Sequence, residues 1–361
     1  MEERLAMLET GDSALSWSTT DGRHLWGRNF DSNRLAGGSA VTYVPAGTKY
    51  AVCGSSLTGD VVDRSRQRAR YAAVGTGLLQ IPSSPILYEG INERGLMGGQ
   101  LCYRGCACYG TQRPKGACPI QPPFLVYHLL AQCATVEEVA ETLQNRLSLE
   151  NRPLLGTIPP LHWAFSDRTG EMVIVEPEAE GVKIYRHTLG VVTNSPGYAW
   201  HRTNLLNYGA VRDLGHDAVT FGEERLEPCF SGSGGQGMPG DWSSPSRFVR
   251  LAFLRKYAVK GACEAQGVAR MLRLMQSAAL PLGMVRGSPP GDLAALHRGA
   301  VPFDYTVYTA VCCAESGRYY WTSYENQRVR YVSLEQLKKR DRPQQFPLEC
   351  APDFLCVSER V

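Results

Sequence analysis

The chain has no long hydrophobic segment, no strongly basic region and no cysteine before Cys53. A membrane span needs roughly 20 consecutive apolar residues, and no such run occurs. The N-terminal residues MEERLAMLETG lack the apolar core of a secretory signal. The 38 basic and 35 acidic residues give a net charge of +3 and are well mixed. A role at a membrane or on nucleic acid is therefore disfavoured, and a cytoplasmic protein is expected.

The sequence also lacks the paired ligands that are typical of metal sites. Its twelve cysteines include a cluster at positions 102, 106, 108 and 118, but the spacing contains no CxxC pair. The seven histidines form no HExxH or similar pair. With no secretory signal, reduced thiols are expected rather than disulfides. We therefore expect no metal and no other cofactor.

What the sequence does contain is a series of short strand and turn signals. Asp21-Gly22 favours a tight hairpin between two strands that span residues 14–29. A second strand pair is expected over 86–103, with its turn at Asn92 to Gly95. Three further strands are expected over residues 40–47, 49–54 and 68–75.

From Pro123 the pattern changes to helix, and then it alternates between strands and helices. Thr135 and Glu138 form a capping box ahead of a helix over 136–144. Amphipathic helices are expected over 246–258 and 264–280. Strands are expected over residues 161–187 with turns at 168–170 and 179–181, and over 189–196, 305–313, 318–325 and 329–334. With 43% hydrophobic residues, the chain fits layered sheets that helices cover within one domain.

Six segments of the chain, in order, resemble the choloylglycine hydrolase family. These N-terminal-nucleophile amidases include bile salt hydrolases and penicillin V acylases. The resemblance runs from about Gly11 to Leu334 and implies an α+β fold, a four-layer αββα sandwich. It also implies a propeptide-like leader at residues 1–11 and a single domain at 12–361. The segments are TTDGRHLWGRNFD, GINERGLMGGQL, LHWAFSD, VVTNSP, GMPGDWSSPSRFVRLAFL and YTVYTAVCC followed by YYWTSYEN.

The resemblance implies a cysteine nucleophile that becomes the first residue when the leader removes itself. Its thiol attacks an amide carbonyl, and its α-amine is the base because such an amine titrates near 8. The resulting thioester is then hydrolysed. In the family an arginine lies sixteen positions after the cysteine, and an aspartate lies three further on. Arg28 and Asp31 match these two residues, so the nucleophile position is Asp12.

An aspartate at position 12 leaves three interpretations open. The chain is an inactive or impaired form of a cysteine enzyme, or a pseudoenzyme that binds an acyl amide without cutting it. Alternatively, Ser13 is the nucleophile after cleavage behind Asp12, or the register is misread. A shift of about 1 Å already costs on the order of a hundredfold in rate, which disfavours Ser13. Whether Asp12 is natural stays open. Because Asp12 carries no thiol or hydroxyl on Cβ, we expect the leader to stay attached, in or over the pocket.

The resemblance also gives roles to the other site residues. Asp31 orients the α-amine and Arg28 favours the thiolate, although the two are alternatively an ordinary ion pair. Asn194 is an oxyanion donor or merely a turn residue. Arg247 is an active-site arginine or a solvated residue in a first helical turn. Cys102 lies where bile salt hydrolases commonly carry Asn and penicillin V acylases carry Tyr, so it supports neither substrate and weakens a second oxyanion donor. As a displaced nucleophile it would lack the α-amine.

The expected substrate is a small linear amide, such as an acyl-amino acid, a conjugated bile salt, penicillin V or a fatty acyl amide. Residues 197–236 form an excursion rich in Tyr, Trp and Leu. Family members with such a segment are often homotetramers, and exposed aromatic residues favour an interface. The alternative is a lid over the substrate pocket.

Overall fold

The structure, a computed structural model, describes residues 11–54, 61–79, 84–111, 114–154, 156–286 and 303–360. Within these residues, a seven-stranded sheet runs in the order β15-β1-β2-β19-β20-β21, with β18 paired to β19. All of its pairs are antiparallel. Its strands are β1 (Gly11–Ser18), β2 (His24–Ser32), β15 (Val191–Val192), β18 (Val285–Arg286), β19 (Phe303–Cys313), β20 (Arg318–Ser323) and β21 (Arg330–Ser333).

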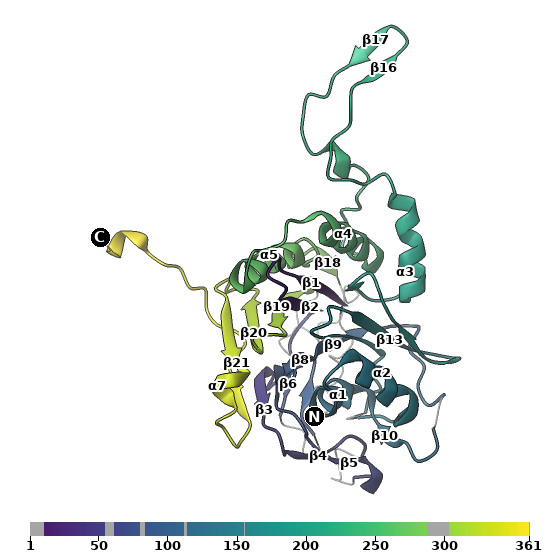
Figure 1. The fold of residues 1–361 in the computed structure, drawn as a ribbon, viewed down its shortest axis with the longest axis vertical. Helices are drawn as coiled ribbons and strands as arrows, with labels where there is room; N and C mark the ends of the chain where they lie inside the picture. The colour runs from purple at the N-terminus through teal and green to yellow at the C-terminus, as the bar shows by residue number, and fades with distance from the viewer. Residues whose placement is uncertain are drawn as a thin grey trace.

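A second sheet of nine strands, again within the described residues, lies against the first (Figure 1). Its order is β14-β13-β12-β9-β8-β6-β3-β22, with β7 paired to β6. The strands are β3 (Ala40–Val44), β6 (Ala73–Leu78), β7 (Ile86–Leu87), β8 (Glu89–Asn92), β9 (Met97–Cys102), β12 (Leu161–Ser166), β13 (Met172–Glu178), β14 (Gly181–Tyr185) and β22 (Gln344–Phe346).

Helices cover the outer face of each sheet, so the expected αββα sandwich is confirmed (Figure 1). Helices α4 (Ser244–Tyr257) and α5 (Glu264–Gln276) contact the seven-stranded sheet. Helices α1 (Leu125–Gln132) and α2 (Val136–Asn145) contact the nine-stranded sheet. None of the helices in the described ranges is long and apolar enough to cross a membrane.

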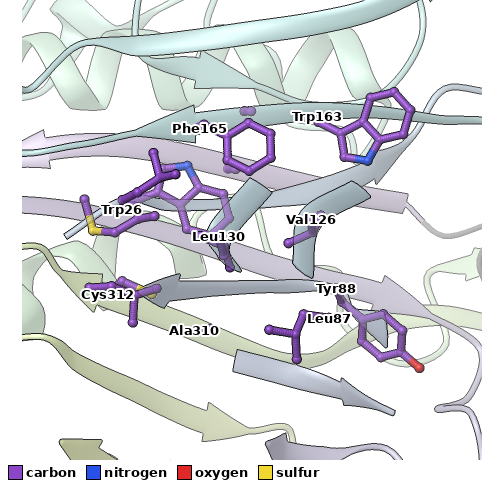
Figure 2. Close-up of a cluster of buried hydrophobic side chains, with 14 of the residues drawn as sticks. Trp26, Leu87, Tyr88, Val126, Leu130, Trp163, Phe165, Ala310 and Cys312 are labelled. Carbon is purple, nitrogen blue, oxygen red and sulfur yellow. The ribbon is translucent and has the colours of Figure 1, made fainter. Parts of the chain in front are cut away.

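Buried side chains from both sheets and from α1 form one hydrophobic core (Figure 2). Trp26 of β2 and Phe165 of β12 are both fully buried there. The sheets approach so closely at Gly99 of β9 that an added Cβ would lie 2.8 Å from Trp26 of β2. The same Cβ would lie 2.7 Å from Glu89 on the neighbouring strand β8. This tight contact holds the inner faces of β2 and β8 in fixed positions relative to each other.

Most elements that the sequence predicts are confirmed, including the 86–103 strand pair and the cap of α2. The hydroxyl of Thr135 accepts a hydrogen bond of 3.2 Å from the backbone N–H of Glu138. The first hairpin is wrong in detail, because a five-residue connection at 19–23 replaces a two-residue turn. Helix α4 begins two residues before the predicted start, and α5 ends four residues early.

Several short elements were not predicted from the sequence. Among them are α3 (Tyr198–Asn204) and the hairpin β16 (Val219–Phe221) and β17 (Glu224–Leu226), which lie in the excursion. The others are β5 (Arg66–Arg68), β10 (Cys118–Ile120), β11 (Leu147–Leu149) and α7 (Leu334–Leu337), and β22 was also missed. The strand expected over 49–54 is found as the shorter β4 (Lys49–Ala51). All twelve cysteines lie in the described part of the chain, and none of them forms a disulfide there.

Candidate active site

The site forms at the start of β1, where the strand pairs with β2. Asp12 lies opposite Phe30, and Gly11 lies opposite Asp31. Because side chains alternate along a strand, Asp12 faces the second sheet whereas Ser13 faces the helices. Both residues are fully buried. The same alternation places Arg28 and Asp31 on opposite faces of β2.

The carboxylate of Asp12 accepts hydrogen bonds from both sheets. Arg28 Nη2 donates to Asp12 Oδ1 at 2.7 Å, and the backbone N–H of Cys102 donates to Asp12 Oδ2 at 3.1 Å. The Cys102 donor is a backbone group, so it is present whatever side chain residue 102 carries. Two donors that belong to different sheets therefore converge on the side chain at position 12.

Asn194 lies beside this carboxylate and links the same elements. Its Oδ1 accepts from the backbone N–H of Asp12 at 2.9 Å and from Arg247 Nη2 at 2.7 Å. Its Nδ2 donates to the carbonyl of Cys102 at 2.9 Å. The hydroxyl of Ser244 accepts from the Asn194 backbone N–H at 3.0 Å. The Asn194 side chain therefore contacts position 12 and its neighbours, which a residue that only makes a turn would not do.

Two buried histidines support the loop that carries Asn194. His162 Nε2 lies 2.9 Å from the carbonyl oxygen of Thr193, and His201 Nε2 lies 2.9 Å from that of Asn194. A carbonyl only accepts, so both rings donate from Nε2. Burial lowers the pKa of His201 to about 4, which keeps that ring neutral at pH 7. The donor from His201 therefore does not change charge near neutral pH.

Arg247 lies in the first turn of α4 but is buried, so its interpretation as a solvated residue is wrong. Its Nη1 donates to the carbonyl of Asp12 at 2.6 Å and to the hydroxyl of Ser13 at 2.7 Å. Its Nε donates to the carbonyl of Trp242 at 2.9 Å, and Asp31 Oδ2 lies 3.6 Å from Nη1. Burial lowers the pKa of Arg247, although Asp31 and Asp12 oppose that shift.

Asp31 is fully buried on the same face as Arg247. Its Oδ1 accepts from the hydroxyl of Thr306 at 2.5 Å, whereas its Oδ2 has no hydrogen-bond donor among the described residues. Burial raises the pKa of Asp31 to about 6, with Arg247 and Thr306 opposing. A Cβ added at Gly11 would lie 3.4 Å from Asp31 Cβ, so this carboxylate is adjacent to the backbone that precedes position 12.

Arg28 does not pair with Asp31, and the ordinary ion pair between them is wrong. Its two partners are Asp12 and Glu89, both fully buried. Burial alone would lower the pKa of Arg28, but Asp12 and Glu89 together raise it. Sequence reasoning missed Glu89, although a charged residue inside the apolar run PILYEGI signals a buried carboxylate that needs a partner.

The structure thus brings together the candidate residues that the sequence singles out. Asp12 faces Arg28 and the backbone of Cys102. Asn194 contacts the backbone of both Asp12 and Cys102. Ser13 lies with Arg247 and Asp31 on the opposite face of β1. The expectation that the leader lies in or over the pocket concerns residues 1–10, which are outside the described residues. Chemically, the donors around position 12 are arranged to stabilise negative charge.

Comparisons with known proteins all point to one family. The model of the linear amide C–N hydrolases, choloylglycine hydrolase family, matches residues 13–344. A bile salt hydrolase/transferase of Clostridium perfringens is 30% identical over 327 residues, which cover 89% of this chain and 92% of the relative. Another, from Lactiplantibacillus plantarum, is 31% identical over 266 residues, or 73% of this chain and 78% of the relative.

Solved structures give the same result. A mutant conjugated bile acid hydrolase from Clostridium perfringens matches with a TM-score of 0.81 and 27% identity, over 96% of this chain and 99% of that chain. A penicillin V acylase from Agrobacterium tumefaciens matches with a TM-score of 0.65 over 91% of this chain and 88% of that chain. The acylase is 17% identical, so that likeness shows a common fold alone.

Proposed function

Because the chain belongs to the choloylglycine hydrolase family of linear amide C–N hydrolases, we propose that its site is built to hydrolyse a linear amide and that Asp12 occupies the nucleophile position. The observation that carries this proposal is the convergence of Arg28 Nη2 and the Cys102 N–H on the Asp12 side chain. A nucleophile that develops negative charge needs such donors.

The spacing of the site residues supports the register at position 12, which lies one residue before the matched family range. Two solved structures of the Clostridium perfringens hydrolase are variants, one of a cysteine and one of an arginine sixteen positions later. Asp12 and Arg28 have the same separation, and here they form a buried ion pair at 2.7 Å.

With a thiol at position 12, the surrounding groups would supply each part of amide hydrolysis. Arg28 would favour the thiolate, which attacks the substrate carbonyl carbon. The Cys102 N–H and the Asn194 amide would stabilise the oxyanion. The α-amine, held by Asn194 Oδ1 and Asp31, would pass the thiol proton to the leaving amine. Water would then hydrolyse the thioester and release the acid.

With Asp12, the chain as it stands is proposed not to turn over substrate. A carboxylate is a poor nucleophile toward an amide, and its product would be an anhydride. Moreover, while the leader stays attached, as we expect, the Asp12 nitrogen is a peptide N–H, which donates to Asn194 Oδ1, rather than a basic amine. The Asp12 carboxylate also occupies the donors of the site, because it accepts hydrogen bonds from Arg28 and from the backbone N–H of Cys102. These internal bonds favour, as a second candidate, a protein that binds an acyl amide without cutting it.

The position of the Ser13 hydroxyl disfavours Ser13 as the nucleophile. Its hydroxyl accepts from Arg247 on the helix-facing side of β1, whereas Arg28 and the Cys102 N–H lie on the other side. Cleavage behind Asp12 would therefore expose an amine at Ser13 without bringing its hydroxyl to these donors.

The decisive experiment replaces Asp12 with cysteine and assays a panel of amides. Conjugated bile salts come first because several relatives are bile salt hydrolases, followed by penicillin V and N-acyl amino acids. We expect Asp12→Cys to remove its leader and release free amine, while the parent chain and Asp12→Ala do not. Adding Asn194→Ala to Asp12→Cys should lower kcat by about a hundredfold to a thousandfold. A matured Asp12→Cys protein that cleaves no member of the panel contradicts the proposed function.

We propose that the excursion serves assembly into a homotetramer. Its hairpin β16–β17 extends away from both sheets in Figure 1, which fits an assembly arm better than a lid. Several apolar side chains of the excursion are exposed, as expected of a surface that a second copy covers. They are Leu206, Leu214, Phe221 and Phe230, with exposed fractions between 66% and 81%.

A further inference from the structure

Glu89 is a fully buried carboxylate at the centre of the sandwich, and the chemistry described above does not use it. It lies on β8 and receives donors from the opposite sheet. Tyr308 donates to Oε2 at 2.8 Å, Tyr319 donates to Oε1 at 2.6 Å, and Arg28 Nη1 donates to Oε2. The Tyr319 hydroxyl also lies 2.6 Å from the hydroxyl of Thr76. Every donor comes from a strand, so Glu89 is held firmly in place.

This arrangement divides the guanidinium of Arg28 between two carboxylates. Nη1 is bound to Glu89, whose position is set by the two tyrosines, and Nη2 is directed at residue 12. The guanidinium carbon also lies 4.9 Å from the centre of the Phe30 ring, which limits rotation of the plane. A guanidinium with one edge anchored in this way presents its other edge in a single direction.

We propose that Glu89 is a positioning residue of this site: it anchors Nη1 of Arg28 so that Nη2 faces residue 12, and its charge partly offsets the field of the arginine there. This inference rests on the proposed function of position 12. The simpler alternative is that Glu89 only joins the two sheets, as a carboxylate whose two oxygens both accept hydrogen bonds. The two accounts differ in one respect: only if Glu89 positions Arg28 does a change in its reach, with its charge kept, alter how readily residue 12 becomes an anion.

The test measures the ionisation of a thiol placed at position 12 and needs no catalytic activity. Ultraviolet absorbance of the thiolate is followed against pH in Asp12→Cys, with Asp12→Ser as the reference that carries the same other cysteines. Both are then combined with Glu89→Gln, which keeps the shape and removes the charge, or with Tyr319→Phe, which removes one donor and keeps the charge. Intact mass ensures that only chains in the same processing state are compared.

We expect Glu89→Gln to lower the midpoint of thiolate formation by on the order of one pH unit, because the positive field of Arg28 is no longer offset. Tyr319→Phe should leave the midpoint nearly unchanged. Equal midpoints in all three proteins, or an equal shift in Tyr319→Phe, overturn the proposal.

A failure of Glu89→Gln to fold still leaves a test. Glu89→Asp keeps the charge but shortens the reach to Arg28, so Nη2 is no longer held toward residue 12 and the midpoint of thiolate formation should rise above that of Asp12→Cys alone. An unchanged midpoint in Glu89→Asp overturns the proposal. Because the measurement reports ionisation alone, it is independent of whether Asp12→Cys hydrolyses any amide.

The ionisable groups near this network are constant across the comparison, apart from the substituted ones. On the Glu89 side they are Arg28, Tyr88, Tyr308, Tyr319 and Cys312. On the position 12 side they are Asp31 and Arg247.

Discussion

The raised pKa of Asp31 gives a stability effect that depends on pH. Its pKa is about 6 in the folded chain against an ordinary value of 3.8. Burial raises this pKa by more than the charge of Arg247 and the hydrogen bond from Thr306 lower it. The folded state therefore holds a proton that the unfolded state has already released between these two pH values. The free energy of unfolding should fall as pH rises through this window, and the cost should be fully present above it.

The magnitude follows from the difference between the two pKa values. About two pKa units correspond to about 3 kcal/mol. The comparison is between the parent chain and Asp31→Asn, which cannot ionise. Because Asp31→Asn also changes contacts with Arg247, the informative quantity is how the difference between the two unfolding free energies varies with pH. The parent should lose about 3 kcal/mol relative to Asp31→Asn between pH 4 and pH 7.

The assay is urea unfolding of both proteins at several pH values across this range. Asp213→Asn serves as the matched control because Asp213 is exposed, and its difference from the parent should stay nearly constant. The assignment of a raised pKa to Asp31 would be refuted if the difference in unfolding free energy between the parent and Asp31→Asn stayed constant with pH. It would also be refuted if the parent became more stable relative to Asp31→Asn as pH rises. After Asp12→Cys has matured, the new α-amine beside Asp31 should reduce the effect.

Three further predictions follow from the site and the fold. Intact-mass analysis of the purified parent should find the leader still attached, and a species that begins at residue 12 or 13 would show that processing survives. Light scattering should find a homotetramer, whereas a monomer near 40 kDa would favour the lid. Arg28→Met should lower the free energy of unfolding by about 3–5 kcal/mol, since Asp12 and Glu89 would be left buried without their cation. Chemical denaturation measures this loss, and a change below about 1 kcal/mol would argue against the buried network.

The repeating patterns of the sequence predicted the strands and helices that build the sandwich. Alternation and turn residues located β8 and β9, and the Thr135 cap located α2. Elements of two or three residues, such as β10 and β22, contain too few residues to form a pattern. Helix α3 was missed because it is short and lies next to Asn194 in a segment that reads as an irregular excursion.

The site residues were predicted from spacing and resemblance, but their contacts were not. Alternation along β1 explains why Asp12 and Ser13 face different sides, and this was not drawn from the sequence. The role of residue 102 was attributed to its side chain, whereas the donor is a backbone N–H that no sequence pattern reveals. Glu89 was missed because its partners Tyr308 and Tyr319 lie more than 200 residues away, and only folding brings them together.

The most direct test of the central claim is to trap the acyl group on residue 12. Asp12→Cys is mixed with an amide that it cleaves, quenched in acid, digested and analysed by peptide mass spectrometry. The account predicts an added acyl mass on the peptide that begins at residue 12, and no such mass in Asp12→Ala. An acyl mass on another cysteine, such as Cys102, or steady hydrolysis with residue 12 never acylated, would contradict the claim that position 12 is the nucleophile position.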